Sequence, residues 1–119
     1  MNSKSVKEEV KRYLESKGFT TSNGDQKLVN LLGERVEFKG VVGVVENKMK
    51  VYWKWDPEKD VGEISVSIYN ISNRGEEFAE NLESKGFIVE VVDKNVYGKV
   101  KFRGNGFRKL KETVSTIKE

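Results

Sequence analysis

A strict alternation of apolar and polar side chains in the middle of the chain is the feature that most constrains the fold. In "KVYWKWD" the side chains of Val51, Trp53 and Trp55 share one face of an extended segment, because successive side chains of a strand point to opposite faces. The same period of two recurs in "RVEFK" before it and in "EISVSIY" after it, with "ENK" and "PEKDVG" as turns. Residues 33–69 therefore predict a three-stranded antiparallel meander. Both tryptophans are expected in its core, and an exposed stacking surface is the alternative for them.

Helical patterns lie on either side of this meander. The first helix is expected to begin at Ser5 and to end at Gly18, and the second to begin at Asn73 and to end at Gly86. Ser5 and Asn73 are each followed three residues later by Glu, which is the spacing of a capping box. A third helix is expected to begin near Asn105, because apolar residues recur there at helical spacing.

The remaining segments complete the element order. Residues 20–27, "TTSNGDQK", read as a loop, and residues 28–32, "LVNLL", as either a helical turn or a short strand. After the second helix, "FIVEVV" and "YGKVKFR" predict a second hairpin around residues 93–95. The order is then α–β–β–β–α–β–β–α within one α+β domain over residues 1–119. We expect one antiparallel sheet of about five strands, with the helices packed on one face.

The hexapeptide "LESKGF" occurs twice, at residues 14–19 and 82–87. Helices commonly end with a left-handed Gly at the position called C′, followed by an apolar residue that contacts C3 in the last turn. Gly18 and Gly86 suit the first role, and the Leu and Phe of each copy suit the second. The repeat therefore predicts two helices that end in the same way. An ancient duplication and a ligand motif used twice are the alternatives.

Composition argues against several kinds of chemistry. The chain has no cysteine and no histidine, which removes thiolate chemistry and the commonest general base and transition-metal ligand. We expect no cofactor, no metal and no enzymatic activity. No apolar run approaches the roughly 20 residues of a membrane span, and the first residues lack the apolar core of a signal peptide, so a soluble cytoplasmic protein is expected. The single Pro, the absence of Cys and the many Lys, Glu and Val residues favour a thermophilic source.

Charge is distributed unevenly along the chain. Residues 1–93 hold 14 Lys and Arg against 17 Asp and Glu, a net charge of −3, whereas residues 94–119 hold 8 against 2, a net charge of +6. Such asymmetry points to an anionic partner. The cations are concentrated in "KVKFRGNGFRKLK", Lys99–Lys111, which is called the basic segment below.

The basic segment divides into a strand, a turn and the start of the third helix. Three cations alternate with apolar residues and so share one face of the strand. The helix then begins with Arg108 and Lys109, although helix N-termini favour acidic residues. Free N–H groups at a glycine-flanked helix start suit an anion such as a phosphate, with a solvated basic helix and other anions as alternatives. The predicted nucleic-acid-binding residues are Lys99, Lys101, Arg103, Gly104, Asn105, Gly106, Arg108, Lys109 and Lys111.

Other residues of the first three strands could extend this surface. Arg35, Lys39 and Lys54 would enlarge it if their strands present the same face as the basic segment. Tyr52 and Tyr97 would then lie beside it and offer rings on which bases stack.

A further candidate is a metal-dependent nuclease site. The residues Glu37, Phe38 and Lys39 have the ExK spacing of such a nuclease strand, with Asp25 upstream of them. The acid and the ExK need to lie on adjacent strands, but Asp25 is expected in a loop. Because any strand with alternating charges contains this spacing, it is the least favoured of the hypotheses.

The element order gives resemblances at the level of the fold. The order α–β–β–β–α–β–β–α resembles that of type III secretion chaperones, which are acidic dimers that bind unfolded effector segments; the basic segment departs from that pattern. The first α–β–β–β–α resembles double-stranded RNA-binding domains, although "NRGEEFAE" is acidic where those domains are basic. The stretch "GERVEFKGVVGVVENKMKVYWKWD" is similar in rhythm to small SH3-like barrels. Likeness of this kind does not determine function.

The sequence therefore favours a small, non-enzymatic protein that binds DNA or RNA through phosphate contacts from the basic segment. Phosphate contacts carry little sequence information, so a weak sequence preference is expected. A protein-interaction or chaperone-like module that acts as a homodimer is the alternative.

Overall fold

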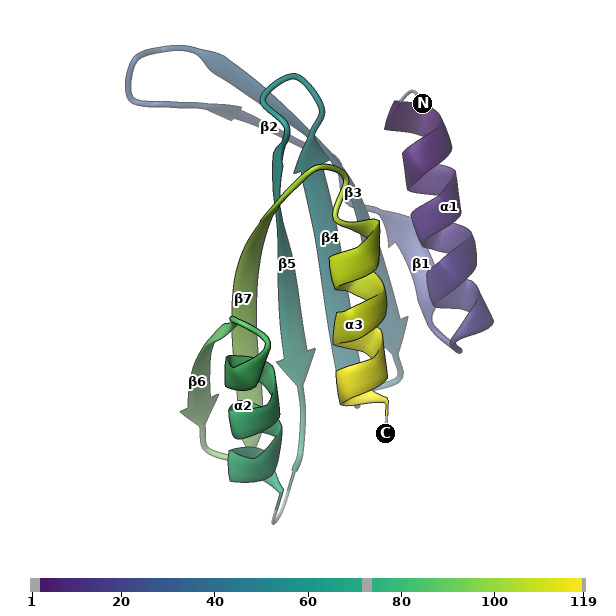
Figure 1. Ribbon diagram of the computed structural model, residues 1–119, viewed down its shortest axis with the longest axis vertical. Coiled ribbons are helices and arrows are strands. Elements are labelled where there is room, and N and C mark those ends of the chain that lie inside the picture. The colour runs from purple at the N-terminus through teal and green to yellow at the C-terminus, as the bar shows by residue number, and fades with distance from the viewer. Residues whose placement is uncertain (1–2, 72–73, 119) are drawn as a thin grey trace.

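Over residues 3–71 and 74–118, which the computed structural model describes, seven antiparallel strands form a sheet that carries three helices on one face (Figure 1). The predicted α+β class, with its helices on one face, is confirmed. None of the described helices is long and apolar enough to cross a membrane. The elements are α1 (Ser3–Ser16), β1 (Thr20–Asn23), β2 (Gln26–Val29), β3 (Arg35–Val45), β4 (Met49–Asp56), β5 (Val61–Ile68), α2 (Gly75–Ser84), β6 (Ile88–Val92), β7 (Asn95–Arg103) and α3 (Phe107–Ile117).

The sheet joins the predicted meander to the predicted second hairpin. The strand order is β1–β3–β4–β5–β7–β6, and β2 lies beyond β1 along the same edge of β3. Strands β3, β4 and β5 form the meander, with Val41 opposite Trp53 and Trp53 opposite Ile64. The β6–β7 hairpin joins it through β7, which pairs with β5. The strand that carries half of the basic segment therefore lies inside the sheet.

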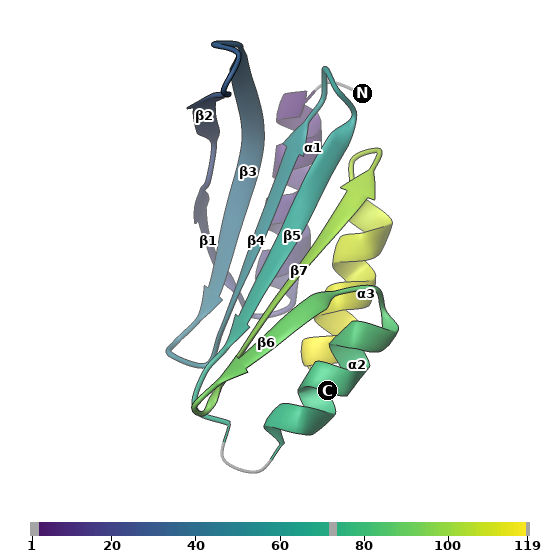
Figure 2. The same cartoon turned by 90° about the vertical axis from the view of Figure 1, so that its left-hand side faces the viewer.

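The core lies between the sheet and the helices. Val51 and Trp53 are fully buried and Trp55 is 9% exposed, so the expectation that both tryptophans belong to the core is confirmed. In Figure 1, α3 lies in front of the central strands between α1 and α2. Figure 2 shows all three helices on the same side of the twisted sheet. The opposite side is called the helix-free face.

The expectation of a loop over residues 20–27 is wrong. This stretch contains β1 and the start of β2, and both strands pair with the long strand β3. At the junction between them, the N–H of Gly24 donates to the carbonyl oxygen of Gly40 at 2.9 Å. Residues 28–32, for which a helical turn and a short strand were open, contain the end of β2, which continues to Val29. The two strands raise the number in the sheet above the five expected.

The predicted role of "LESKGF" as a helix end is confirmed in both copies. Gly18 and Gly86 both have φ of +92°. The N–H of Phe19 donates to the carbonyl oxygen of Leu14 at 3.0 Å, and the N–H of Phe87 to that of Leu82 at 3.1 Å. These are the hydrogen bonds of a Schellman motif, in which the residue after Gly closes on the last turn. All four of these Leu and Phe side chains are buried.

The predicted first residues of the helices agree less closely with the structure than the predicted helix ends. Because α1 begins at Ser3, Ser5 lies inside its first turn and is not the N-cap; nothing in "SKS" prevents the helix from starting earlier. Asn73 lies outside the described residues, and α2 begins at Gly75. The third helix begins at Phe107, close to the expected Asn105.

Candidate nucleic-acid interface

The strand half of the basic segment lies on the helix-free face. Val96, Gly98 and Val100 of β7 point toward the helices and are buried, whereas Lys99 and Lys101 alternate with them and are exposed. Arg103 continues this exposed row at the end of the strand. The structure therefore brings the three predicted strand cations together on one open surface, as the alternation predicts.

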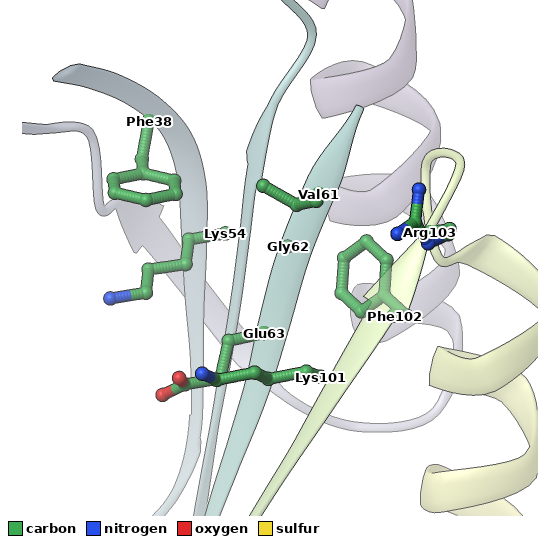
Figure 3. A pocket seen from close by; sticks show the side chains of 8 residues that line it. All are labelled: Phe38, Lys54, Val61, Gly62, Glu63, Lys101, Phe102 and Arg103. Atoms are coloured by element: carbon green, nitrogen blue, oxygen red, sulfur yellow. The ribbon is translucent and has the colours of Figure 1, made fainter. Parts of the chain in front are cut away.

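Lys54 joins this row from β4. It lies opposite Glu63 of β5, and Glu63 lies opposite Lys101 of β7, so a carboxylate separates the two lysines across the sheet. The ammonium of Lys54 lies 4.8 Å from the centre of the Phe38 ring. Figure 3 shows Lys54, Glu63 and Lys101 extending toward the same side of the sheet. The surface is thus basic but interrupted by one acid.

These side chains border a hollow on the helix-free face. Its volume is about 600 Å³, within the range of small-ligand pockets. The hollow contains both apolar and charged groups, and Figure 3 shows how they surround it. Its lining residues are Phe38, Lys54, Val61, Gly62, Glu63, Lys101, Phe102 and Arg103.

Of the three cations proposed to extend the surface across the sheet, one lies on the predicted face. Lys54 lies on the helix-free face, but Lys39 lies opposite the core residue Trp55 and therefore on the other face. Arg35, four residues earlier on β3, follows the same alternation as Lys39. The register of β3 on β4, which decides the face, is set by pairing between strands and was not available from the local pattern.

Tyr52 and Tyr97 both lie on the helix-free face and are half-buried. The hydroxyl of Tyr52 donates to the carbonyl oxygen of Gly24, and the ring of Tyr97 packs edge-on against Tyr69 at 6.4 Å between centroids. Burial, with the nearby charges of Asp25 and Glu63, raises the pKa of Tyr52. Both rings are therefore held in place beside the basic row, and the raised pKa keeps the Tyr52 hydroxyl protonated at physiological pH.

The turn of the basic segment is anchored to the core. The indole Nε1–H of Trp53 donates to the carbonyl oxygen of Asn105 at 2.7 Å. The side chain of Asn105 in turn accepts the N–H of Phe107 at 3.0 Å. Gly106 has φ of +71°, and a Cβ built on it would lie 2.4 Å from the Phe102 ring. One N–H of the helix start is thus already satisfied within the protein, which weakens the predicted anion site there.

The helix half of the basic segment is directed at the rest of the fold. The ammonium of Lys109 donates to the carbonyl oxygen of Lys85 and lies 3.3 Å from Glu112. That of Lys111 lies 4.7 Å from the centre of the Phe107 ring. Arg108 is exposed. The nine predicted residues therefore do not form one surface: the strand cations face outward on the helix-free side, and two helix cations support α3.

The charge of Lys109 also explains the reversed start of α3. Its partner, the Lys85 carbonyl, belongs to the C-cap residue that directly follows α2. Helix C-termini favour cations. Lys109 is therefore unfavourable for the dipole of its own helix and favourable for that of α2, a relation that only the packing of the two helices reveals.

Around Asp25 the described residues do not assemble the carboxylates of a nuclease. Asp25 Oδ1 accepts the Lys7 ammonium at 2.7 Å and the Gly40 N–H at 2.8 Å, and Glu37 lies 3.9 Å from Lys27. Burial raises the pKa of Asp25, but the hydrogen bonds from Lys7 and Gly40 and the charges of Lys7 and Lys39 outweigh it, so the pKa is lowered overall. No cluster of three potential metal ligands occurs among the residues described. Asp25 joins β1 and β2 to their neighbours.

Two features of the surface were not foreseen from the sequence. Phe38 contributes an aromatic wall to the hollow, and Glu63 places a negative charge within the basic row. The alternation in "RVEFK" and "EISVSIY" already predicted which neighbours share a face with each of them, but not that their strands lie in this order relative to β7.

No protein-family model, curated protein or solved structure matches this chain.

Proposed function

We propose that this chain is a small, non-enzymatic nucleic-acid-binding protein whose helix-free face contacts phosphates. The observation that carries the proposal is the exposed row of Lys99, Lys101 and Arg103 on β7, joined across the sheet by Lys54. Alternate residues of a strand lie roughly 6.6 Å apart, a spacing similar to that of successive phosphates along an extended nucleic-acid strand. Lys and Arg pair with phosphate oxygens through charge-assisted hydrogen bonds.

The aromatic rings favour unpaired bases as part of the ligand. Tyr52 and Tyr97 lie on the same face as the cations, and Phe38 borders the hollow beside Lys54. Base stacking on aromatic side chains contributes about 1–3 kcal/mol per base and tolerates any sequence. A single strand that crosses the sheet could meet phosphates and rings together, whereas a duplex would meet the phosphates alone.

The direct test is a titration of labelled single- and double-stranded DNA and RNA at several salt concentrations. Phosphate contacts predict that log K falls linearly with log salt, by about 0.7 per contact on single strands and about 0.9 on duplex DNA. Lys101→Gln with Arg103→Gln should make the slope of log K against log salt shallower by the amount that corresponds to about two phosphate contacts. The matched control removes two exposed charges far from the basic segment in the sequence, Arg12→Gln on α1 with Lys17→Gln in the turn that follows α1, and should leave the slope unchanged.

A second pair of variants separates the two halves of the basic segment. Arg108→Gln with Lys111→Gln removes the same charge from α3 and should reduce the slope less than the strand pair. If the helix pair has the larger effect, phosphates bind at the helix start and the helix-free face is the wrong surface. Absence of binding at low salt to every nucleic acid would end the proposal.

The alternative function, a protein-interaction or chaperone-like module, is favoured by a different observation. Large apolar side chains are exposed at both edges of the sheet, among them Leu31 and Leu32 beyond β2 and Ile88 on β6. Exposed apolar patches mark interaction surfaces. Self-association without any affinity for nucleic acid would support this alternative.

A further inference from the structure

The hairpin of β2 and the first part of β3 leaves the body of the sheet as a two-stranded ribbon, Gln26–Phe38. Strand β4 pairs with β3 only from Lys39 onward, so the first residues of β3 pair with β2 alone. Figure 1 shows this ribbon projecting at the upper left, away from the three helices. A two-stranded hairpin that packs against nothing is only marginally stable in water.

The ribbon exposes an unusual amount of apolar surface. Leu31 is 106% exposed, Leu32 is 84% exposed and Val29 is 68% exposed. Leu28 on β2 is 47% exposed. In a monomer these neighbouring side chains would remain in water, although burying one of them completely is worth about 1.5–3 kcal/mol.

The tip of the ribbon has a well-defined hydrogen-bonded turn. The side-chain oxygen of Asn30 accepts the N–H groups of Leu32 and Glu34, both at 2.9 Å. The N–H of Asn30 donates to the carbonyl oxygen of Glu34 at 2.9 Å, and the N–H of Gly33 to that of Asn30 at 3.0 Å. The turn therefore fixes the backbone that carries the two leucines, which lowers the backbone conformational entropy lost when they are buried.

The outer edge of β2 is open among the described residues, because β2 pairs only with β3. Residues of an antiparallel pair alternate between bonding to their partner and pointing away from it. Since Asn30 bonds to Glu34, Leu28 also bonds inward, and Lys27 and Val29 direct their N–H and C=O groups to the open edge. An open edge of this kind is a template for another strand.

The charges of the ribbon suit a second copy of the same ribbon. It carries two cations, Lys27 and Arg35, and two acids, Glu34 and Glu37, so it has no net charge to attract phosphate or to repel itself. In an antiparallel pair about a two-fold axis, Leu28 would lie opposite Leu28 of the second copy, and Lys27 opposite its Val29. No like charges then face each other.

The other edge of the sheet lacks this self-complementarity. Strand β6 also exposes apolar side chains, with Ile88 at 83% and Val91 at 46%. In the register that would pair all five of its residues with a second β6, Glu90 lies opposite Glu90. Like charges directly opposite each other destabilise a strand pair.

We propose that two copies of this chain associate through antiparallel pairing of their β2 edges, which places the exposed Leu28 side chains of the two ribbons against each other. The two-fold axis lies perpendicular to the sheet, as in isologous interfaces. Both helix-free faces then lie on the same side of the dimer. This inference does not depend on the proposed nucleic-acid binding.

Sedimentation equilibrium of the purified chain, without nucleic acid, tests the pairing. The expected mass is twice the 13.6 kDa of one chain, falling toward the monomer on dilution. Val29→Pro removes an N–H that points to the open edge, which an edge strand tolerates, and should raise the dimer dissociation constant about tenfold or more. Ile88→Ser on β6 is the matched control and should leave it unchanged.

A charge-pair experiment tests the register itself. Leu28→Glu and Leu28→Lys should each be monomeric alone, because like charges would meet across the two-fold axis, and the two proteins mixed should form a dimer. Rescue on mixing excludes misfolding as the reason for the separate monomers. A monomeric natural chain at high micromolar concentration, a dimer unaffected by Val29→Pro, or the absence of rescue would each overturn the proposal.

Discussion

The strand half and the helix half of the basic segment contain three cations each, yet the fold uses them differently. Lys99, Lys101 and Arg103 are exposed on the helix-free face, whereas Lys109 holds the end of α2 and Lys111 lies over the Phe107 ring. The two halves are joined by a turn that hydrogen-bonds to Trp53 in the core. A run of like charges in a sequence therefore does not describe one surface: the element that carries each charge decides whether it is free for a ligand.

Substitutions in the turn that separates the two halves should lower the stability of the protein most. Gly106→Ala places a Cβ on a residue with left-handed backbone conformation and pushes that Cβ against the Phe102 ring. We therefore expect the unfolding free energy to fall by about 3 kcal/mol or more. Gly104→Ala has a similar φ of +75° but nothing within 4 Å, and should cost about 1 kcal/mol. Urea denaturation measures both. Equal losses would mean that contact with Phe102 does not matter.

Substitution of Trp53, whose indole anchors the turn, should give the next largest loss of stability. Trp53→Phe removes the donor to the Asn105 carbonyl and some buried volume, and should lower the unfolding free energy by about 2 kcal/mol. Trp55 is the matched control, because its Nε1 is buried without a hydrogen-bond partner among the described residues. Trp55→Phe should therefore cost less, about 1 kcal/mol. Thermal unfolding of the two variants at the same salt concentration measures both losses. A larger loss for Trp55→Phe than for Trp53→Phe would show that the hydrogen bond of Trp53 does not anchor the turn.

Substitution of single cations should have the smallest effects on stability. A cation of the helix half should affect mainly stability, and a cation of the strand half mainly nucleic-acid affinity. Lys109→Met loses the contact with Lys85 and the ion pair with Glu112, which should cost about 1 kcal/mol of stability. Lys99→Met should change stability by no more than about 0.5 kcal/mol, because Lys99 is exposed. Nucleic-acid titration should give the reverse order, with the larger loss for Lys99→Met. A stability loss at Lys99 that matches the loss at Lys109 would remove the distinction between the halves.

Much of the fold follows from local patterns. The alternation around Val51 and Trp53 predicted the meander and its buried face, and the two "LESKGF" copies predicted where α1 and α2 end. These features depend on side-chain periodicity and on one backbone conformation at each Gly. Both are properties of a few adjacent residues.

The missed features depend on partners that are distant in the sequence. β1 and β2 are too short and polar to be recognised alone, and they are strands because β3 is long enough to pair with both. The face of Lys39 follows from strand register, and the contact of Lys109 follows from the packing of α3 on α2. Local sequence does not determine these relations, which tertiary pairing sets.

The position of α3 has a consequence for the order in which the protein can be made. Of the described elements α3 is synthesised last, yet its turn covers Trp53 in the second strand of the meander. On the ribosome, α1 is already available to pack on β3 when the meander emerges, but the part of the apolar face around Trp53 in β4 is not covered until α3 has followed. Domains generally fold as units, and unpaired edges and exposed apolar surface promote aggregation in the meantime. We expect chains truncated before Asn105 to aggregate instead of folding, so that the basic segment also completes the molecule.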